Sequence, residues 1–175
     1  MKKRKRIAIL LDAVALIILT AIDQITKYYA VLKLKNKPAI PIINDVLELN
    51  YLENRGAAFG LLQNQKFFFL FVGIVILGVI LFVLFKIPGK KKYDCLHVLL
   101  VMIASGAIGN MIDRIRLDYV VDFISIVLIN FPIFNVADMY VTISMIGLFV
   151  LILFIYKEDD LSFLSFTQKK YREIK

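Results

Sequence analysis

Residues 134–155 read FNVADMYVTISMIGLFVLILFI, in which an aspartate, Asp138, stands directly before a long run without any charged side chain. As an α-helix, the run Met139–Ile155 is about 26 Å long, close to the roughly 30 Å of a bilayer's hydrocarbon core. A carboxylate beside lipid is costly to ionise, so it is retained where it has a function. This stretch therefore predicts a membrane-spanning helix with a functional polar group at one end.

Three further apolar runs have a similar length and character. They are Ile7–Ile22, Phe67–Phe85 and Leu96–Ile112. Hydrophobic residues make up 60% of the 175-residue chain, above the roughly 45–50% of a soluble domain. We therefore predict an all-α membrane protein, with a single domain of four transmembrane helices over residues 1–157 and a tail at 158–175.

The distribution of basic residues predicts the orientation in the membrane. With the N-terminus inside, the inner segments contain 14 Lys and Arg in 36 residues, against 8 in 70 for the outer segments. Basic residues accumulate in cytoplasmic loops, so we expect both termini, and with them the tail, in the cytoplasm. The same side chains can contact anionic lipid headgroups, which explains the net charge of +8 without a nucleic-acid partner. The inner segments are 1–6, 86–95 and 156–175, and the outer segments are 23–66 and 113–138.

Two ionisable residues lie inside predicted spans. Asp12 interrupts the first run, and we expect it to extend toward the inner surface or to contact a polar group on a neighbouring helix. His97, the only histidine, lies near the inner end of the third run, where a packing or interfacial role is expected. A single histidine also disfavours a zinc protease, whose metal needs several such ligands. Ser105 is about 12 Å from His97 along one helix, too far for a serine–histidine protease.

The first outer loop contains a predicted β element. Leu47–Tyr51 alternates apolar and polar residues, as in a strand with one buried face, and Asn54-Arg55-Gly56 follows as a turn. Ala57–Gly60 then leads to the second span. We expect this small β element to lie on the outer surface of the membrane, beside or over the helix ends. A solvated loop without fixed structure is the alternative.

Aspartates gather on the predicted outer side of the membrane. Two carboxylates that meet at a membrane surface are the minimum equipment for acid–base hydrolysis. Asp23 and Lys27 are spaced for a salt bridge within one helix. Asp113 could pair with the adjacent Arg114 or orient that arginine. The outer aspartates expected at or near helix ends are Asp23, Asp113, Asp122 and Asp138.

Small residues crowd the late part of the third predicted span, around Ser105 and Gly106. They predict close packing against another helix. Gly106, Asn110 and Arg114 follow at four-residue intervals, so they share one helix face that begins small and ends polar near the surface.

Five short motifs recur in a recognisable order along the chain. They are Asp23-Gln24-Ile25-Thr26-Lys27, Asn54-Arg55-Gly56-Ala57-Ala58-Phe59-Gly60, Gly109-Asn110-Met111-Ile112-Asp113-Arg114, Val120-Val121-Asp122-Phe123 and Phe134-Asn135-Val136-Ala137-Asp138. Together they resemble the lipoprotein signal peptidases, also called signal peptidase II. Each motif alone is unspecific, but five in this order on four spans are specific. Where that family often has two glycines this chain has Ser105-Gly106, and the tail beyond Lys157 is not part of the resemblance.

The resemblance implies a bacterial plasma-membrane aspartic endopeptidase with its active site at the extracytoplasmic face. The family removes the signal peptide from diacylglyceryl-modified prolipoproteins, cutting just before the lipidated cysteine, and uses no metal or organic cofactor. The partners are thus this lipidated substrate and membrane lipid, and we expect a monomer. By motif position the catalytic pair is Asp122 and Asp138. The positions implied to bind substrate are Asn54, Gly56, Asn110, Arg114 and Asn135. Those implied as structural supports are Asp23, Lys27 and Asp113.

The residues by themselves leave two other functions open. A small proton-coupled transporter would also carry acids, although here they gather at one surface, and a non-enzymatic membrane scaffold would use them as interfacial anchors. In a protease, two nearby carboxylates would share one proton, so that one acts as base on water and the other as acid. Asp138 is the expected base, because a helix N-terminus favours its charged form.

Overall fold

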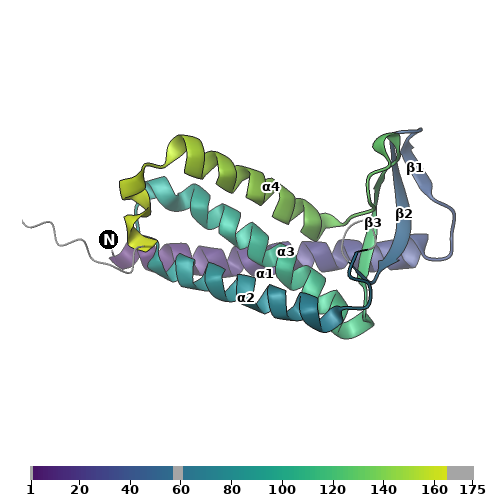
Figure 1. Ribbon diagram of the computed structural model, residues 1–175, viewed down its shortest axis with the longest axis horizontal. Helices are drawn as coiled ribbons and strands as arrows, with labels where there is room; N and C mark the ends of the chain where they lie inside the picture. Colours follow the sequence, from purple (N-terminus) through teal and green to yellow (C-terminus); the bar gives the residue numbers. More distant parts are fainter. Residues whose placement is uncertain (1, 57–60, 165–175) are drawn as a thin grey trace, which may run out of the picture.

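Four long helices run side by side, and a small sheet lies at one end of the bundle, which we call the sheet end (Figure 1). The computed structural model describes residues 2–56 and 61–164. The predicted connection Ala57–Gly60 and the tail from residue 165 onward lie outside the described residues. The helices are α1 (Lys2–Leu34), α2 (Lys66–Lys86), α3 (Asp94–Leu117) and α4 (Val136–Val150). The strands are β1 (Ile40–Ile43), β2 (Leu47–Asn54) and β3 (Val120–Ile126). Shorter helical segments are η2 (Lys91–Tyr93), η3 (Val127–Ile129), η4 (Leu151–Ile155) and η5 (Glu158–Leu164).

All four helices, α4 together with η4, are long and apolar enough to cross a membrane, which agrees with the four predicted spans. Three of them bury only 6–11% of their most apolar stretch inside the protein, whereas α3 with the preceding η2 buries 56%. Apolar side chains on α1, α2 and α4 therefore face outward, as contact with lipid requires. The other helices pack around α3, which is the central helix.

The first helix is longer than the predicted span Ile7–Ile22, because it continues to Leu34. Residues 2–34 contain neither glycine nor proline, so nothing local interrupts the helix. Its last turns pack on the sheet, where Ala30 and Leu34 form a buried apolar cluster with Val121 and Phe123. The sheet thus supplies the apolar surface that this part of α1 would otherwise lack.

The sheet is larger than the sequence predicted, and it corrects the all-α fold class to a mostly helical one. Its three antiparallel strands have the order β1-β2-β3, and β2 contains the predicted Leu47–Tyr51. The third strand comes from the second outer segment, so Asp122 lies in a strand and not at a helix end. Residues 120–123 are buried on both faces. Their run therefore lacks the alternation by which a half-buried strand is recognised in a sequence.

The predicted close packing of the third span is between α3 and α4. A methyl group added at Gly106 would lie 2.5 Å from the carbonyl oxygen of Ala137 and 2.8 Å from Cγ2 of Val141. Ser105 beside it is fully buried, and its hydroxyl donates to the carbonyl oxygen of Val101 at 2.8 Å. These small residues bring the start of α4, which carries Asp138, directly against α3.

At the end opposite the sheet, Asp12 has a partner that the sequence did not identify. Its carboxylate lies 2.7 Å from Nδ1 of His97 on α3, and both side chains are largely buried. His97 therefore makes a polar contact in addition to packing. The segment Glu158–Leu164 also lies at this end, where the hydroxyl of Tyr93 donates to the carbonyl oxygen of Asp160 at 2.9 Å.

We expect Gly106→Ala to destabilise the protein, because its new methyl group meets the backbone of α4, which cannot yield without separating the two helices. Overpacking of this kind costs about 1–3 kcal/mol. Gly78→Ala on α2 is the matched control, since nothing lies within 4 Å of its new methyl group. Thermal unfolding in detergent micelles should show a lowered Tm for Gly106→Ala only. Equal Tm values for the two variants would contradict the close contact.

Candidate active site

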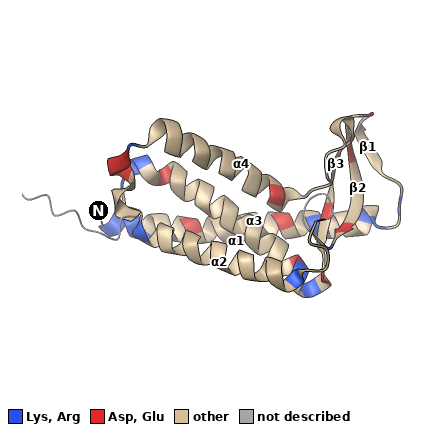
Figure 2. Cartoon of the chain, in the orientation of Figure 1, with Lys and Arg blue, Asp and Glu red and all other residues tan. Residues whose placement is uncertain are grey.

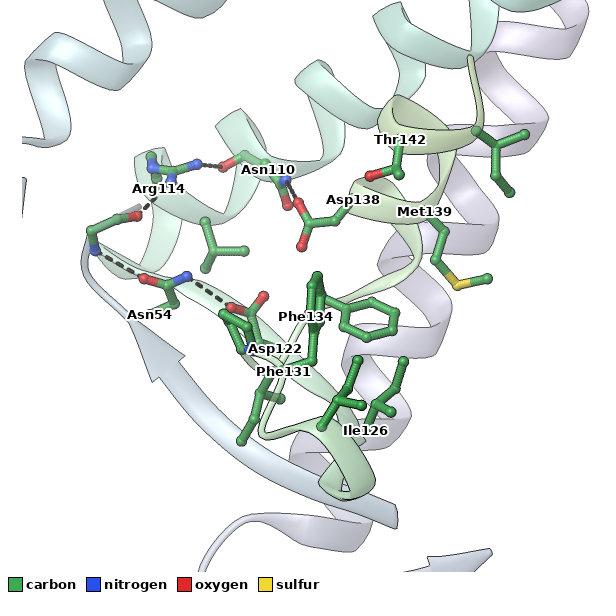
Figure 3. A pocket seen from close by; sticks show the side chains of 16 residues that line it. Asn54, Asn110, Arg114, Asp122, Ile126, Phe131, Phe134, Asp138, Met139 and Thr142 are labelled. Carbon is green, nitrogen blue, oxygen red and sulfur yellow. Dashed lines mark hydrogen bonds between the residues drawn. The ribbon is translucent and has the colours of Figure 1, made fainter. Parts of the chain in front are cut away.

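A cavity of about 570 Å³ opens at the sheet end, between the sheet, α3 and α4 (Figure 3). Asp122 from β3 and Asp138 from α4 both line it, although they come from different elements. Its other polar lining includes Asn54, Asn110 and Arg114, all of which the sequence had proposed for substrate binding. The rest is mainly apolar, and the apolar lining residues are Val120, Ile126, Ile129, Phe131, Pro132, Ile133, Phe134, Met139 and Ile143.

The sheet brings Asn54 to Asp122. In the register of β2 and β3, Asn54 lies opposite Val120, and Asp122 is two residues farther along β3. Residues in this diagonal relation share one face of a sheet. The side-chain amide of Asn54 accordingly donates to Oδ2 of Asp122 at 2.8 Å, and its oxygen accepts the N–H of Gly56 at 3.0 Å.

The start of α4 brings Asn135 to both aspartates. Asn135 is the N-cap residue, and its side-chain oxygen accepts the N–H of Asp138 at 3.0 Å. In return Oδ2 of Asp138 accepts the N–H of Asn135 at 3.1 Å, which completes a capping box. The amide nitrogen of Asn135 then donates to Oδ1 of Asp122 at 2.6 Å, so one residue caps the helix and contacts the other carboxylate.

Asn110 on α3 completes the set of donors. Its amide nitrogen donates to Oδ1 of Asp138 at 2.8 Å. Each of the four carboxylate oxygens of Asp122 and Asp138 thus accepts one hydrogen bond, from three asparagine amides and one main-chain N–H. Both carboxylates are fixed in direction while they still face the cavity.

The environment of Asp122 changes its acidity. Burial, and after it the nearby Asp138 carboxylate, raises the pKa of Asp122 to about 7. Hydrogen bonds from Asn54 and Asn135 and the charge of Lys27 oppose this rise. Below about pH 7 the side chain is therefore protonated and can donate a hydrogen bond into the cavity.

Behind the cavity, the three predicted support residues form one buried cluster. The predicted salt bridge between Lys27 and Asp23 is present at 3.0 Å, but it is buried and not on a helix surface. Lys27 also lies 3.0 Å from the carboxylate of Asp113. Asp113 thus pairs with Lys27 and not with the adjacent Arg114, whose pairing was one of the two alternatives that the sequence left open. The sequence could not distinguish these partners, because Lys27 belongs to another helix.

The sequence analysis assigned no role to Gln24, which belongs to this cluster. Its amide nitrogen donates to the carboxylate of Asp113 at 3.0 Å, to the carbonyl oxygen of Gly109 at 3.1 Å and to Asp23 at 3.2 Å. Its presence in the first motif was the only signal available. Gln24 holds α1 against α3 at the level of the cavity.

Arg114 lines the cavity and is held by main-chain and aromatic groups. Its guanidinium donates to the carbonyl oxygens of Gly56 at 3.2 Å and Asn110 at 3.4 Å. It also lies 4.4 Å from the ring centroid of Phe69 on α2, a cation–π contact that the sequence did not predict. Gly56 therefore acts through its main chain, which orients both Arg114 and Asn54.

Comparison with known proteins decides what kind of protein this is. A family model described as Signal peptidase (SPase) II matches residues 15–154. The chain belongs to the signal peptidase II family. Membership in the signal peptidase II family makes it a peptidase. The matched range also contains all ten residues that the sequence analysis proposed for the site and its support.

Similar proteins and a solved structure support the assignment of the chain to the signal peptidase II family. The chain is 44% identical over 147 residues to a lipoprotein signal peptidase of Streptococcus thermophilus, covering 84% of this chain and 93% of the relative. It is 39% identical over 160 residues to a lipoprotein signal peptidase of Streptococcus pyogenes serotype M5, covering 91% and 98%. A bacterial membrane enzyme solved by the in meso method at 2.3 Å resolution has the same fold, with a TM-score of 0.74, 30% identity and 94% of each chain covered. This chain is thus a multi-pass membrane enzyme.

We expect Asn135→Ala to destabilise the protein by about 1 kcal/mol, because alanine cannot cap α4. Asn135→Ser keeps an oxygen that can accept the N–H of Asp138, so it should lose less stability, although both variants lose the amide that reaches Asp122. Equilibrium unfolding of the two purified variants in detergent measures this difference. Equal losses would show that the cap contributes nothing.

Proposed function

We propose that this protein is an aspartic endopeptidase that removes the signal peptide from diacylglyceryl-modified bacterial prolipoproteins, cutting just before the lipidated cysteine. The observation that carries the proposal is the pair Asp122 and Asp138, which line one cavity in a chain of the signal peptidase II family. Two carboxylates on one cavity are the chemical equipment that peptide hydrolysis needs.

The two aspartates have different environments, which assigns them different roles. Asp122 is buried with a pKa of about 7, so it is the proton donor. Asp138 is the third residue of α4, and its carboxylate accepts the N–H of Asn135 and the side-chain amide of Asn110, two donors that stabilise a negative charge. Asp138 is therefore the base, as the sequence analysis expected.

The reaction follows from these roles. A water molecule between the carboxylates attacks the scissile carbonyl carbon, Asp138 accepts its proton, and Asp122 gives its proton to the carbonyl oxygen. In the resulting tetrahedral intermediate the C–N bond then breaks. The leaving nitrogen takes the proton from Asp138, and Asp122 recovers one from a hydroxyl of the intermediate. Both aspartates return to their starting states.

The cavity lining supports a substrate with an apolar and a polar part. Ile129, Phe131 and Ile143 belong to its apolar wall, which suits an acyl chain or the apolar end of a signal peptide. Arg114 has five N–H donors, and those not used by Gly56 and Asn110 remain for carbonyl oxygens of the substrate.

Charge supports an active site on the extracytoplasmic face of the plasma membrane. Many of the basic residues gather at the end of the bundle opposite the cavity, near the N-terminus (Figure 2). That end is therefore the cytoplasmic one, and the cavity opens on the other side.

We expect Asp122→Asn and Asp138→Asn to abolish cleavage, because neither amide can exchange a proton with the substrate or water. The measurement is release of the signal peptide from a diacylglyceryl-modified prolipoprotein by purified enzyme in detergent or lipid vesicles. Because the new NH₂ group of Asp122→Asn faces the amide of either Asn54 or Asn135, thermal unfolding is measured beside cleavage, so that loss of activity is scored only in folded protein.

Asp118→Asn is the matched control for both substitutions. Asp118 lies at the same end of the protein but is exposed, and its φ of 67° is one that asparagine also tolerates. This variant should cleave normally. Normal cleavage by folded Asp122→Asn or Asp138→Asn would refute the proposed mechanism.

The pH profile tests the role of Asp122. As the acid it must be protonated, so kcat/KM should fall as pH rises through about 7. Asn54→Ala removes a donor that stabilises the charged carboxylate, which raises the pKa further and moves this fall to higher pH. Asn50→Ala on the same strand is the control and should leave the profile in place. The charged groups that act on Asp122 are Asp138 from α4, Lys27 from α1 and Arg114 from α3. A fall that stays in place in Asn54→Ala would exclude Asp122 as the titrating group.

A further inference from the structure

The three asparagines around the aspartate pair must all point in one direction to act as donors. A side-chain amide has an accepting oxygen on one side and a donating NH₂ group of similar size on the other. Asn54 and Asn135 are oriented by the main chain, because their oxygens accept the N–H groups of Gly56 and Asp138. Their NH₂ groups consequently face Asp122.

Asn110 is oriented by a charged side chain. Its oxygen accepts hydrogen bonds from Nζ of Lys27 at 2.8 Å and from the side-chain amide of Asn135 at 3.2 Å, and its nitrogen donates to Asp138 at 2.8 Å. An ammonium group can only donate, so the side of Asn110 that faces Lys27 must be its oxygen. The donor to Asp138 is thus oriented by two groups, and the shorter and charged contact comes from Lys27 on another helix.

Lys27 itself has no freedom to turn away. Its ammonium group has three N–H donors, and three oxygens lie within 3.0 Å, one each from Asp23, Asp113 and Asn110. The side chain is 3% exposed, so water does not compete for these contacts. Lys27 lies behind Asn110 and is not among the residues that line the cavity.

We infer that Lys27 is a positioning residue for the reaction, which acts by fixing the amide of Asn110 so that its NH₂ group always faces Asp138. This inference rests on the proposed function and goes beyond a structural support role for Lys27. If Asn110 turned over, its oxygen would face the carboxylate, and the repulsion between two acceptors would displace Asp138 from the attacking water. Loss of Lys27 should therefore lower kcat and leave KM unchanged.

A double-mutant cycle tests whether Lys27 acts through Asn110. In the wild-type enzyme Asn110→Ala should lower kcat about tenfold or more. In a Lys27→Met background the same substitution should cost less than about twofold, because only the longer contact from Asn135 is then left to orient the donor. The assay is again release of the signal peptide from a lipidated prolipoprotein, with kcat and KM measured separately.

Gln24→Met provides the matched control for the cycle. Gln24 contacts the same two buried carboxylates, Asp23 and Asp113, but its amide does not contact the side chain of Asn110. In this background Asn110→Ala should keep its full effect on kcat. The inference is overturned if Asn110→Ala costs about tenfold in the Lys27→Met enzyme as well, or if its cost also vanishes in Gln24→Met.

Lys27→Met leaves two buried carboxylates without their cation, and it can prevent folding. In that case the cycle is repeated in an Asp113→Asn background, where one of these charges is absent and Asp23 keeps the N–H of Ala137 as a donor. The same comparison of Asn110→Ala with and without Lys27 decides the outcome. If Asp122→Asn is inactive but the effects of the Lys27 and Asn110 substitutions are additive, only the role of Lys27 is refuted. If Asp122→Asn is active, the proposed function itself is refuted.

Discussion

A single buried ammonium group connects four elements of this protein. Lys27 on α1 is held between Asp23 and Asp113, and each carboxylate also accepts a main-chain N–H from a distant segment. Asp23 accepts the N–H of Ala137, directly before Asp138, and Asp113 accepts the N–H of Val121, directly before Asp122. Buried charges are costly unless all their partners are present, so these contacts form together. The cluster that stabilises the bundle therefore also sets the positions of the two proposed catalytic aspartates.

The two aspartates belong to elements of different kinds, and this difference suits their roles. A strand that is buried on both faces gives Asp122 a surrounding that favours the neutral acid. A helix N-terminus gives Asp138 main-chain N–H groups that favour the charge. Asn135 connects the two, because it caps the helix with one end of its amide and contacts the strand aspartate with the other. In the proposed mechanism, acid and base are thus distinguished by secondary structure and not by residue type.

The sequence predicted the features that are local along the chain. Four apolar runs predicted the spans, alternation at Leu47–Tyr51 predicted part of β2, and the spacing of Asp23 and Lys27 predicted their contact. It missed β3, whose run is apolar on both faces. It did not identify partners on distant segments, such as His97 for Asp12 and Phe69 for Arg114, because no periodicity specifies a partner on another helix. The site residues themselves came from motifs, and the cavity now brings Asn54, Asn110, Arg114, Asp122 and Asp138 together.

The length of the uninterrupted helix α1 bears on the depth of the site in the bilayer. From Lys2 to Asp23 the axis of α1 rises about 32 Å, close to the thickness of a hydrocarbon core of about 30 Å. With its basic end at one membrane surface, α1 places the buried cluster where hydrocarbon gives way to glycerol and headgroups at the other. At that level acyl chains and water are both within reach. For the proposed peptidase, the number of residues between the basic end of α1 and Asp23 would therefore fix how far from the lipid tails a peptide bond is cut.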